Sequence, residues 1–223
     1  MSVASPRALG ESERTLVCLS EAMASRDEAG IEAELRRAAG NTPPERVDEA
    51  VLQACLFLGF PATLETAMRW AAIRGAPAGE SETPESASDE VLARGEDLCR
   101  RVYGSAYDGL RDNVAAAHPA LDRWMVLDGY GRVLSRPGLA AWIRELCIVA
   151  MLASRDWERQ LHSHLRGALR LGAEPDQVAE ALTIGVARQT AETRRRLTKL
   201  WEGVRERHEG REPVEDLDSI DVH

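Results

Sequence analysis

The stretch that decides the fold is residues 139–171, which read LAAWIRELCIVAMLASRDWERQLHSHLRGALRL. Its first half is an apolar segment, and its second half places apolar residues at helical spacing. The polar triplet Ser154-Arg155-Asp156 separates the two halves. This pattern predicts two consecutive helices, at about 139–153 and 157–171.

The rest of the chain also predicts helices, separated by proline and glycine signals. Thr42-Pro43-Pro44-Glu45 is typical of a helix start, and Gly172 is a candidate for the residue that ends a helix. Loops are predicted at Gly129-Tyr130-Gly131 and at Ser135 to Gly138. No segment predicts a strand, so the expected fold class is all-α. The further predicted helices lie at about 12–24, 27–39, 43–59, 64–73, 89–103, 107–117, 121–127 and from 175 onward.

Composition limits the classes of function. Hydrophobic residues make up 44% of the 223 residues, so a core can form, and the net charge of −9 argues against a nucleic-acid-binding protein. No apolar run of about 18 residues predicts a membrane span, and no signal peptide is recognised at the N-terminus. These features predict no membrane partner and a cytoplasmic setting.

Two parts of the chain match each other, which predicts an internal repeat. Ser25-Arg26-Asp27 matches Ser154-Arg155-Asp156, and Trp70 matches Trp201. Two tandem repeats packed as a pseudo-dimer are the expected architecture. The predicted organisation is a tail at 1–10, an N-terminal repeat at 11–75, a linker at 76–90, a C-terminal domain at 91–205 and an acidic tail at 206–223.

The candidate catalytic residues are His164 and Glu145. Helical spacing places His164 among Gln160, Leu161, Gly167 and Ala168, where a titratable group is costly. An imidazole suits proton transfer near neutral pH, and burial of Glu145 would suit it to acid or base chemistry. The alternatives are a core histidine bonded to a backbone carbonyl or a carboxylate, and a Glu145 ion pair with Arg144 or Arg166.

Several segments resemble the carboxymuconolactone decarboxylase family. They are Arg101 to Tyr107, Gly131 to Leu139, Arg144-Glu145-Leu146, the segment around His164 and, in the first half, Leu52 to Ala62. The resemblance covers about 11–75 and 94–203. It implies an alkylhydroperoxidase D-like helical fold and a ring-shaped homo-oligomer, with a trimer favoured for a duplicated chain. The family holds decarboxylases of small lactone acids and thiol peroxidases.

The chain departs from both chemistries. The peroxidases carry a C-x-x-C motif that would fall at positions 157 and 160, which here are Trp157 and Gln160, and none of the four cysteines lies in such a pair. The decarboxylases commonly carry an acid and a tryptophan where this chain has Arg132 and Leu134.

The leading expectation is therefore lyase- or isomerase-type proton transfer on a small carboxylate or lactone, without a cofactor or metal. His164 would transfer the proton, Glu145 would assist, and Arg136 on the Arg-Pro-Gly-Leu motif would hold the carboxylate. An alkylhydroperoxidase D-like thiol peroxidase and a non-catalytic oligomeric binding protein are the alternatives. Further candidate residues for substrate binding are Arg132, Trp157, Gln160 and Tyr130.

Overall fold

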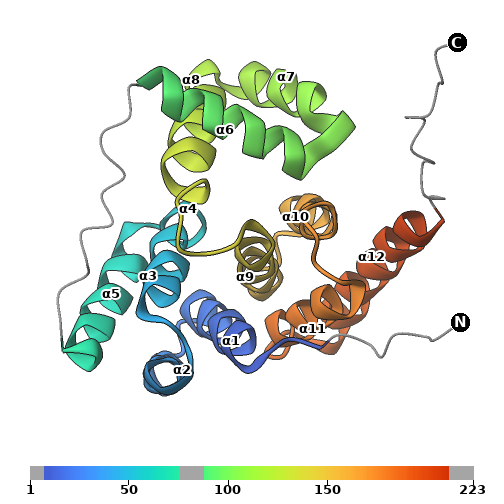
Figure 1. Cartoon of the computed structure of the whole chain (residues 1–223). Coiled ribbons are helices and arrows are strands. Elements are labelled where there is room, and N and C mark those ends of the chain that lie inside the picture. Colours follow the sequence, from blue (N-terminus) through green and yellow to red (C-terminus); the bar gives the residue numbers. More distant parts are fainter. Residues whose placement is uncertain (1–7, 76–87, 211–223) are drawn as a thin grey trace, which may run out of the picture.

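The computed structural model describes residues 8–75 and 88–210, and every regular element within these ranges is helical (Figure 1). The prediction of an all-α fold is confirmed. The expected tails and linker fall largely outside the described residues, at 1–7, 76–87 and 211–223. None of the described helices is long and apolar enough to cross a membrane.

Helix α9 (Ala141–Ser154) forms the centre of the molecule, as Figure 1 shows. All its residues from Ile143 to Ala153 are buried, because its sequence is apolar around nearly the whole helix. It packs against α1 (Glu11–Ser25), α10 (Glu158–Arg170) and α11 (Pro175–Gly185). The two helices predicted at 139–153 and 157–171 correspond to α9 and α10.

The first half of the chain adds four helices beside α1. The single helix predicted at about 43–59 divides after Gln53, and Gly59 ends its second part with a φ of 83°. Phe60 and Pro61 follow the predicted end of that helix and begin the next one. Proline fits the first turn of a helix, where no backbone N–H is needed. These helices are α2 (Glu28–Asn41), α3 (Pro44–Gln53), α4 (Cys55–Leu58) and α5 (Phe60–Arg74).

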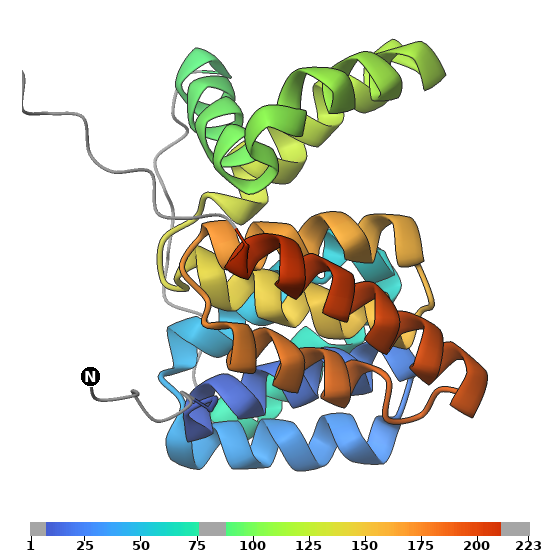
Figure 2. The same cartoon turned by 90° about the vertical axis from the view of Figure 1, so that its right-hand side faces the viewer.

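A group of helices from the middle of the chain covers one end of the molecule, at the top of Figures 1 and 2. The group consists of α6 (Ser88–Tyr103), η1 (Gly104–Ala106), α7 (Tyr107–Ala117), α8 (Pro119–Trp124) and the π-helix η2 (Met125–Leu134).

The predicted loop at 129–131 is wrong, because these residues lie inside η2. Glycines here serve close packing rather than a turn. A Cβ on Gly131 would lie 2.4 Å from the Val91 carbonyl oxygen, and one on Gly95 would lie 2.2 Å from that of Val126. Because Gly95 and Gly131 carry no side chain, η2 and α6 can pack closely together.

The last helix, α12 (Ala191–Glu209), begins at Thr190, whose hydroxyl accepts a hydrogen bond from the Thr193 backbone N–H. The helix continues past residue 205, so the first residues of the expected tail are helical. The internal repeat stays a prediction.

Candidate active site around His164

His164 on α10 faces Glu145 on α9, and the two side chains form a buried pair. The His164 Nδ1 atom lies 2.8 Å from the Glu145 Oε2 atom. His164 is 5% exposed and Glu145 is 2% exposed. A buried carboxylate needs a charged or hydrogen-bonding partner, and the imidazole supplies it. Of the alternatives for Glu145, the ion pair with Arg144 or Arg166 is not found.

A glycine makes room for this pair. Gly167 follows His164 by one helical turn, and a Cβ built on it would lie 2.7 Å from the Glu145 Oε2 atom and 2.8 Å from Val102 Cγ1. Any larger residue would collide with the carboxylate that holds the imidazole. The Gly167 position is therefore part of the site.

His164 lies at the wall of a pocket of about 360 Å³. We call it the His164 pocket, and it forms where α10, α6, α8, η2 and α4 meet. Phe57 and Tyr103 hold the ring, with edge-to-face contacts at centroid distances of 5.7 and 6.4 Å. The pocket is lined by Leu56, Phe57, Tyr103, Leu121, Trp124, Met125, Asp128, Gly129, Tyr130, Leu134 and His164.

The ring nitrogen Nε2 is the atom of His164 that is left for a ligand. Nδ1 is engaged by Glu145, and no other residue of the described ranges bonds the ring. If the carboxylate accepts a hydrogen bond from Nδ1–H, Nε2 carries a lone pair that is available to a ligand. Such an imidazole can accept a proton while Glu145 stabilises the resulting positive charge.

Two tyrosines stand beside the imidazole. The ring centroids of Tyr103 and Tyr130 are 6.3 Å apart, and the two rings meet edge to face. Burial raises the pKa of Tyr130 well above its usual value and raises that of Tyr103 to about 12. Both phenols are therefore neutral and can donate hydrogen bonds at neutral pH.

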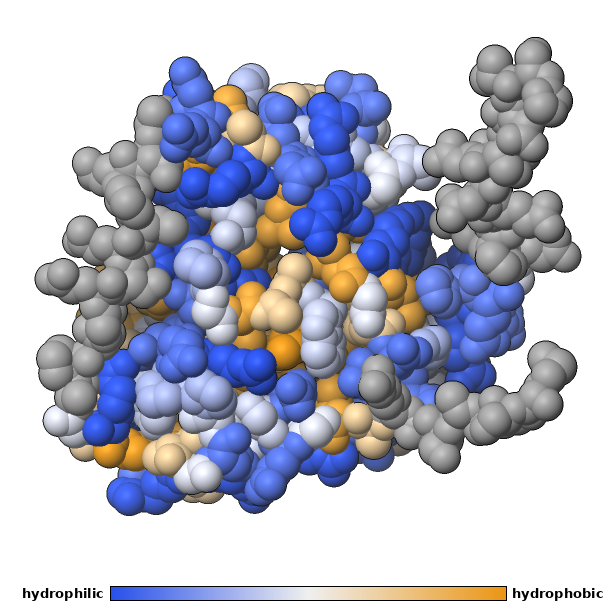
Figure 3. Space-filling view, viewed as in Figure 1, coloured by the Kyte–Doolittle hydropathy of each residue, from blue (hydrophilic) through white to orange (hydrophobic). Residues whose placement is uncertain are grey.

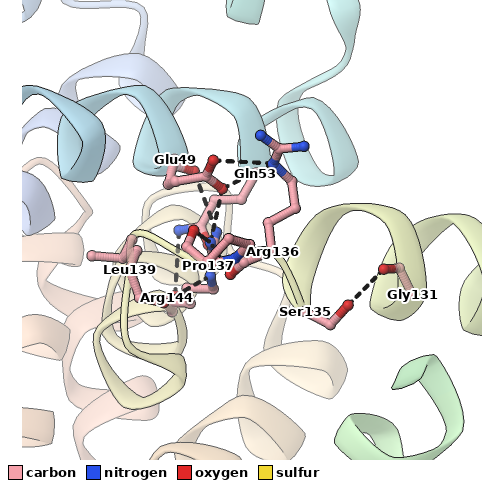
Figure 4. A network of polar contacts seen from close by, with 8 residues as sticks. All are labelled: Glu49, Gln53, Gly131, Ser135, Arg136, Pro137, Leu139 and Arg144. Carbon is pink, nitrogen blue, oxygen red and sulfur yellow. Dashed lines mark hydrogen bonds and ion pairs between the residues drawn. The ribbon is translucent and has the colours of Figure 1, made fainter. Parts of the chain in front are cut away.

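The expected carboxylate-binding arginines are not in this pocket. Arg136 points to α3, where its Nε lies 3.0 Å from Glu49 Oε1 (Figure 4). Arg144 is 2% exposed and donates from Nη2 to Glu49 Oε2 at 2.8 Å. This cluster joins the first half of the chain to the loop before α9, so Arg136 has a structural contact in place of the expected binding role.

Arg132 also lies outside the lining of the pocket. Its side chain is largely exposed, and its Nε donates to Asp128 Oδ1 at 3.0 Å, one helical turn away. Asp128 lines the pocket, but Arg132 does not. Within the described residues, the lining of the pocket contains no arginine or lysine.

Of the remaining expected binding residues, only Tyr130 lines the pocket. Trp157 is 41% exposed and packs under Arg155, and Gln160 is exposed near the start of α10. Neither residue lines the pocket.

Sequence reasoning missed Phe57, Tyr103 and Trp124. Tyr103 and Phe57 lay within segments that carry the family resemblance, yet no periodicity relates them to His164, more than 60 positions away in the chain. The first half of the chain contributes Leu56 and Phe57 to the pocket.

The cysteines are free thiols in the described structure. Burial raises the pKa of Cys99 to about 12 and that of Cys147 to about 11. These thiols are protonated at neutral pH and are poor nucleophiles.

Two comparisons with known proteins give matches to this chain. The carboxymuconolactone decarboxylase family matches residues 106–202, a range that contains His164 and Glu145. A relative from Schizosaccharomyces pombe, named peroxisomal protein 2, is 26% identical over 161 residues, which are 71% of this chain and 75% of that protein. The all-helical architecture is consistent with an alkylhydroperoxidase D-like fold.

Proposed function

We propose that this chain, whose residues 106–202 belong to the carboxymuconolactone decarboxylase family, transfers protons to and from a small carbonyl compound without a cofactor. The observation that carries the proposal is the 2.8 Å contact between His164 Nδ1 and Glu145 Oε2 at the wall of a pocket. A carboxylate that fixes one ring nitrogen leaves the other to act on a substrate.

In the proposed reaction, His164 Nε2 takes a proton from a carbon next to the substrate carbonyl. The electron pair of the broken C–H bond moves into the carbonyl group and gives an enolate. Glu145 stays ionised and stabilises the imidazolium, which then returns the proton to another carbon of the same system. The net result is an isomerisation. If a carboxyl group leaves as CO₂ instead, His164 Nε2 first takes the carboxyl proton, the electron pair of the broken C–C bond gives the enolate, and the imidazolium returns the proton to the enolate carbon.

Tyr103 is suited to stabilise the enolate oxygen. It lines the pocket, and burial keeps its phenol protonated at neutral pH. Its own proton is therefore available for a substrate oxygen. A hydrogen-bond donor that is fixed in an apolar site stabilises the negative charge of an enolate more strongly than a donor in water does.

The lining of the pocket narrows the substrate class. Its side chains are mostly apolar, and the charged one, Asp128, is negative. A substrate carboxylate would find no bidentate arginine here and would meet a like charge. A neutral lactone or ketone therefore fits better than a small carboxylate held by Arg136. The volume of about 360 Å³ falls in the range of small-molecule sites, roughly 300–1,000 Å³.

Deuterium exchange tests the proposal without a known substrate. Unsaturated γ-lactones and cyclic ketones are incubated with the protein in D₂O, and loss of the α-proton signal is followed by NMR. His164→Gln is expected to lower the enzyme-dependent exchange rate by about 10²–10⁴-fold, the usual contribution of general acid–base catalysis.

His162→Gln is the matched control, because His162 lies on the same helix but is absent from the pocket lining. This variant should catalyse deuterium exchange at the same rate as the unchanged protein. Equal rates for both variants, with every compound of the panel, would refute the proposal. Saturable binding with no exchange would instead favour the non-catalytic binding protein.

The thiol peroxidase alternative finds no support in the raised thiol pKa values of Cys99 and Cys147. The homo-oligomer, favoured as a trimer, and the cytoplasmic setting stay predictions. Sedimentation and imaging of a tagged chain would check them.

A further inference from the structure

A second pocket lies between the C-terminal parts of α10 and α12, and its charged lining is entirely basic. Its volume is about 210 Å³, and we call it the cationic pocket. This volume is below the roughly 300–1,000 Å³ of drug-sized sites, so it suits a small ion or one group of a larger molecule. The lining consists of Arg166, Leu169, Arg170, Val204, Arg207 and His208.

The guanidinium groups come from two helices and converge on one space. Arg166 and Arg170 are one turn apart on α10, and Arg207 faces them from α12. Arg170 is fixed in place, since its Nη1 donates to the Val102 carbonyl oxygen at 2.8 Å. Arg207 Nη2 lies 3.5 Å from the Nε2 atom of His162.

Like charges at this spacing repel each other, and no carboxylate of the described residues lines the pocket. Arg170 and Arg207 are in the last turns of their helices, where the helix dipole favours a cation. The dipoles favour Arg170 and Arg207 singly, while the guanidinium groups of Arg166 and Arg207, from two helices, repel each other across the pocket. The cluster is also unusual in a chain whose net charge is −9.

We propose that the cationic pocket binds a phosphate group, either as a free ion or as part of a phosphorylated metabolite. Guanidinium forks match phosphate oxygens with paired hydrogen bonds, and two or three of them around one small space are typical of phosphate recognition. The site is separate from the His164 pocket. His162 and His164 are two positions apart on α10, about 200° around the helix, so the two pockets use different faces of it.

His162 provides a built-in probe of occupancy. Burial and the positive charges of Arg166 and Arg207 lower the pKa of His162. A bound phosphate would offset these charges and raise that pKa, since a nearby negative charge favours the imidazolium. Occupancy can therefore be followed by the NMR titration of one imidazole.

The experiment uses the full chain and inorganic pyrophosphate, with calorimetry and histidine NMR at constant ionic strength. We expect saturable binding with a rise in the pKa of His162. Arg166→Gln and Arg207→Gln should each weaken binding at least tenfold. Arg205→Gln is the matched control, because Arg205 lies on α12 outside the pocket and pairs with Glu209. It should change the affinity less than twofold.

Three outcomes would overturn the proposal. The first is no saturable binding at millimolar pyrophosphate, and the second is an equal loss of affinity in Arg205→Gln. The third is tighter binding of citrate than of pyrophosphate, which would assign the pocket to carboxylates. Orthophosphate and a phosphate monoester, compared in parallel, distinguish a free ion from a phosphorylated metabolite. Thermal melting of each variant checks that the fold is retained.

Discussion

Replacing Gly167 by alanine tests the geometry of the His164–Glu145 pair. The added Cβ would lie 2.7 Å from Glu145 Oε2 and 2.8 Å from Val102 Cγ1, both closer than such contacts allow. The carboxylate must move, which loses a charged hydrogen bond worth about 1.5–3 kcal/mol. Overpacking of the helix interface costs about 1–3 kcal/mol more.

Helix propensity acts in the opposite direction. Alanine in a helix interior is about 1 kcal/mol more favourable than glycine. The expected net effect of Gly167→Ala is a loss of about 1.5–5 kcal/mol in the free energy of unfolding. Urea denaturation, followed by circular dichroism, measures this value.

Gly203→Ala on α12 is the matched control. A Cβ at Gly203 meets only the end of the Arg207 side chain, at 3.5 Å, which is an ordinary contact. This variant should be stabilised by about 0.5–1 kcal/mol. In a Glu145→Ala background, Gly167→Ala should lower the free energy of unfolding by clearly less, because the carboxylate with which the added methyl group collides is absent. If both glycine variants are equally stable, the carboxylate does not lie against Gly167 and the account of the site is wrong.

Three further predictions concern other parts of the molecule. Arg144→Ala should cost about 3–5 kcal/mol because it breaks a buried ion pair and leaves the Glu49 carboxylate with its second partner, Arg136. Arg132→Ala at the surface should cost less than about 1 kcal/mol, and denaturation of both variants compares them. Tyr103→Phe should lower the deuterium exchange rate about 10²-fold, as loss of a donor to the enolate does, and an unchanged rate would remove that role. Between about pH 9 and 11 the unfolded chain ionises the Cys147 thiol while the folded chain keeps it protonated, so stability should fall as pH rises, and Cys147→Ala should flatten this slope in urea titrations.

The helices were largely predictable, because their signals are local. The apolar segment of α9 and the prolines in the first turns of α3 and α11 depend only on neighbours in the sequence. The π-helix η2 was not predictable in this way. Its glycines are typical of a loop, and their role depends on how closely α6 approaches, which is a tertiary property.

The candidate site was predictable only in its centre. His164 and Glu145 stood out because each is a titratable group among apolar neighbours on its own helix. Arg136 was assigned to a substrate because its motif precedes the helices of the site. The sequence could not show that Glu49, 87 positions earlier, takes up its guanidinium. Pairing between distant side chains decides which charged groups are left to face a pocket.

The protonation state of His164 tests the central claim most directly. Nitrogen-15 NMR of histidine-labelled protein at neutral pH distinguishes the two neutral tautomers, and a His164→Gln sample assigns the signal. The account predicts a proton on Nδ1, held by Glu145, with Nε2 bare and shifted when a lactone fills the pocket. A proton found on Nε2, with Nδ1 bare, would contradict it.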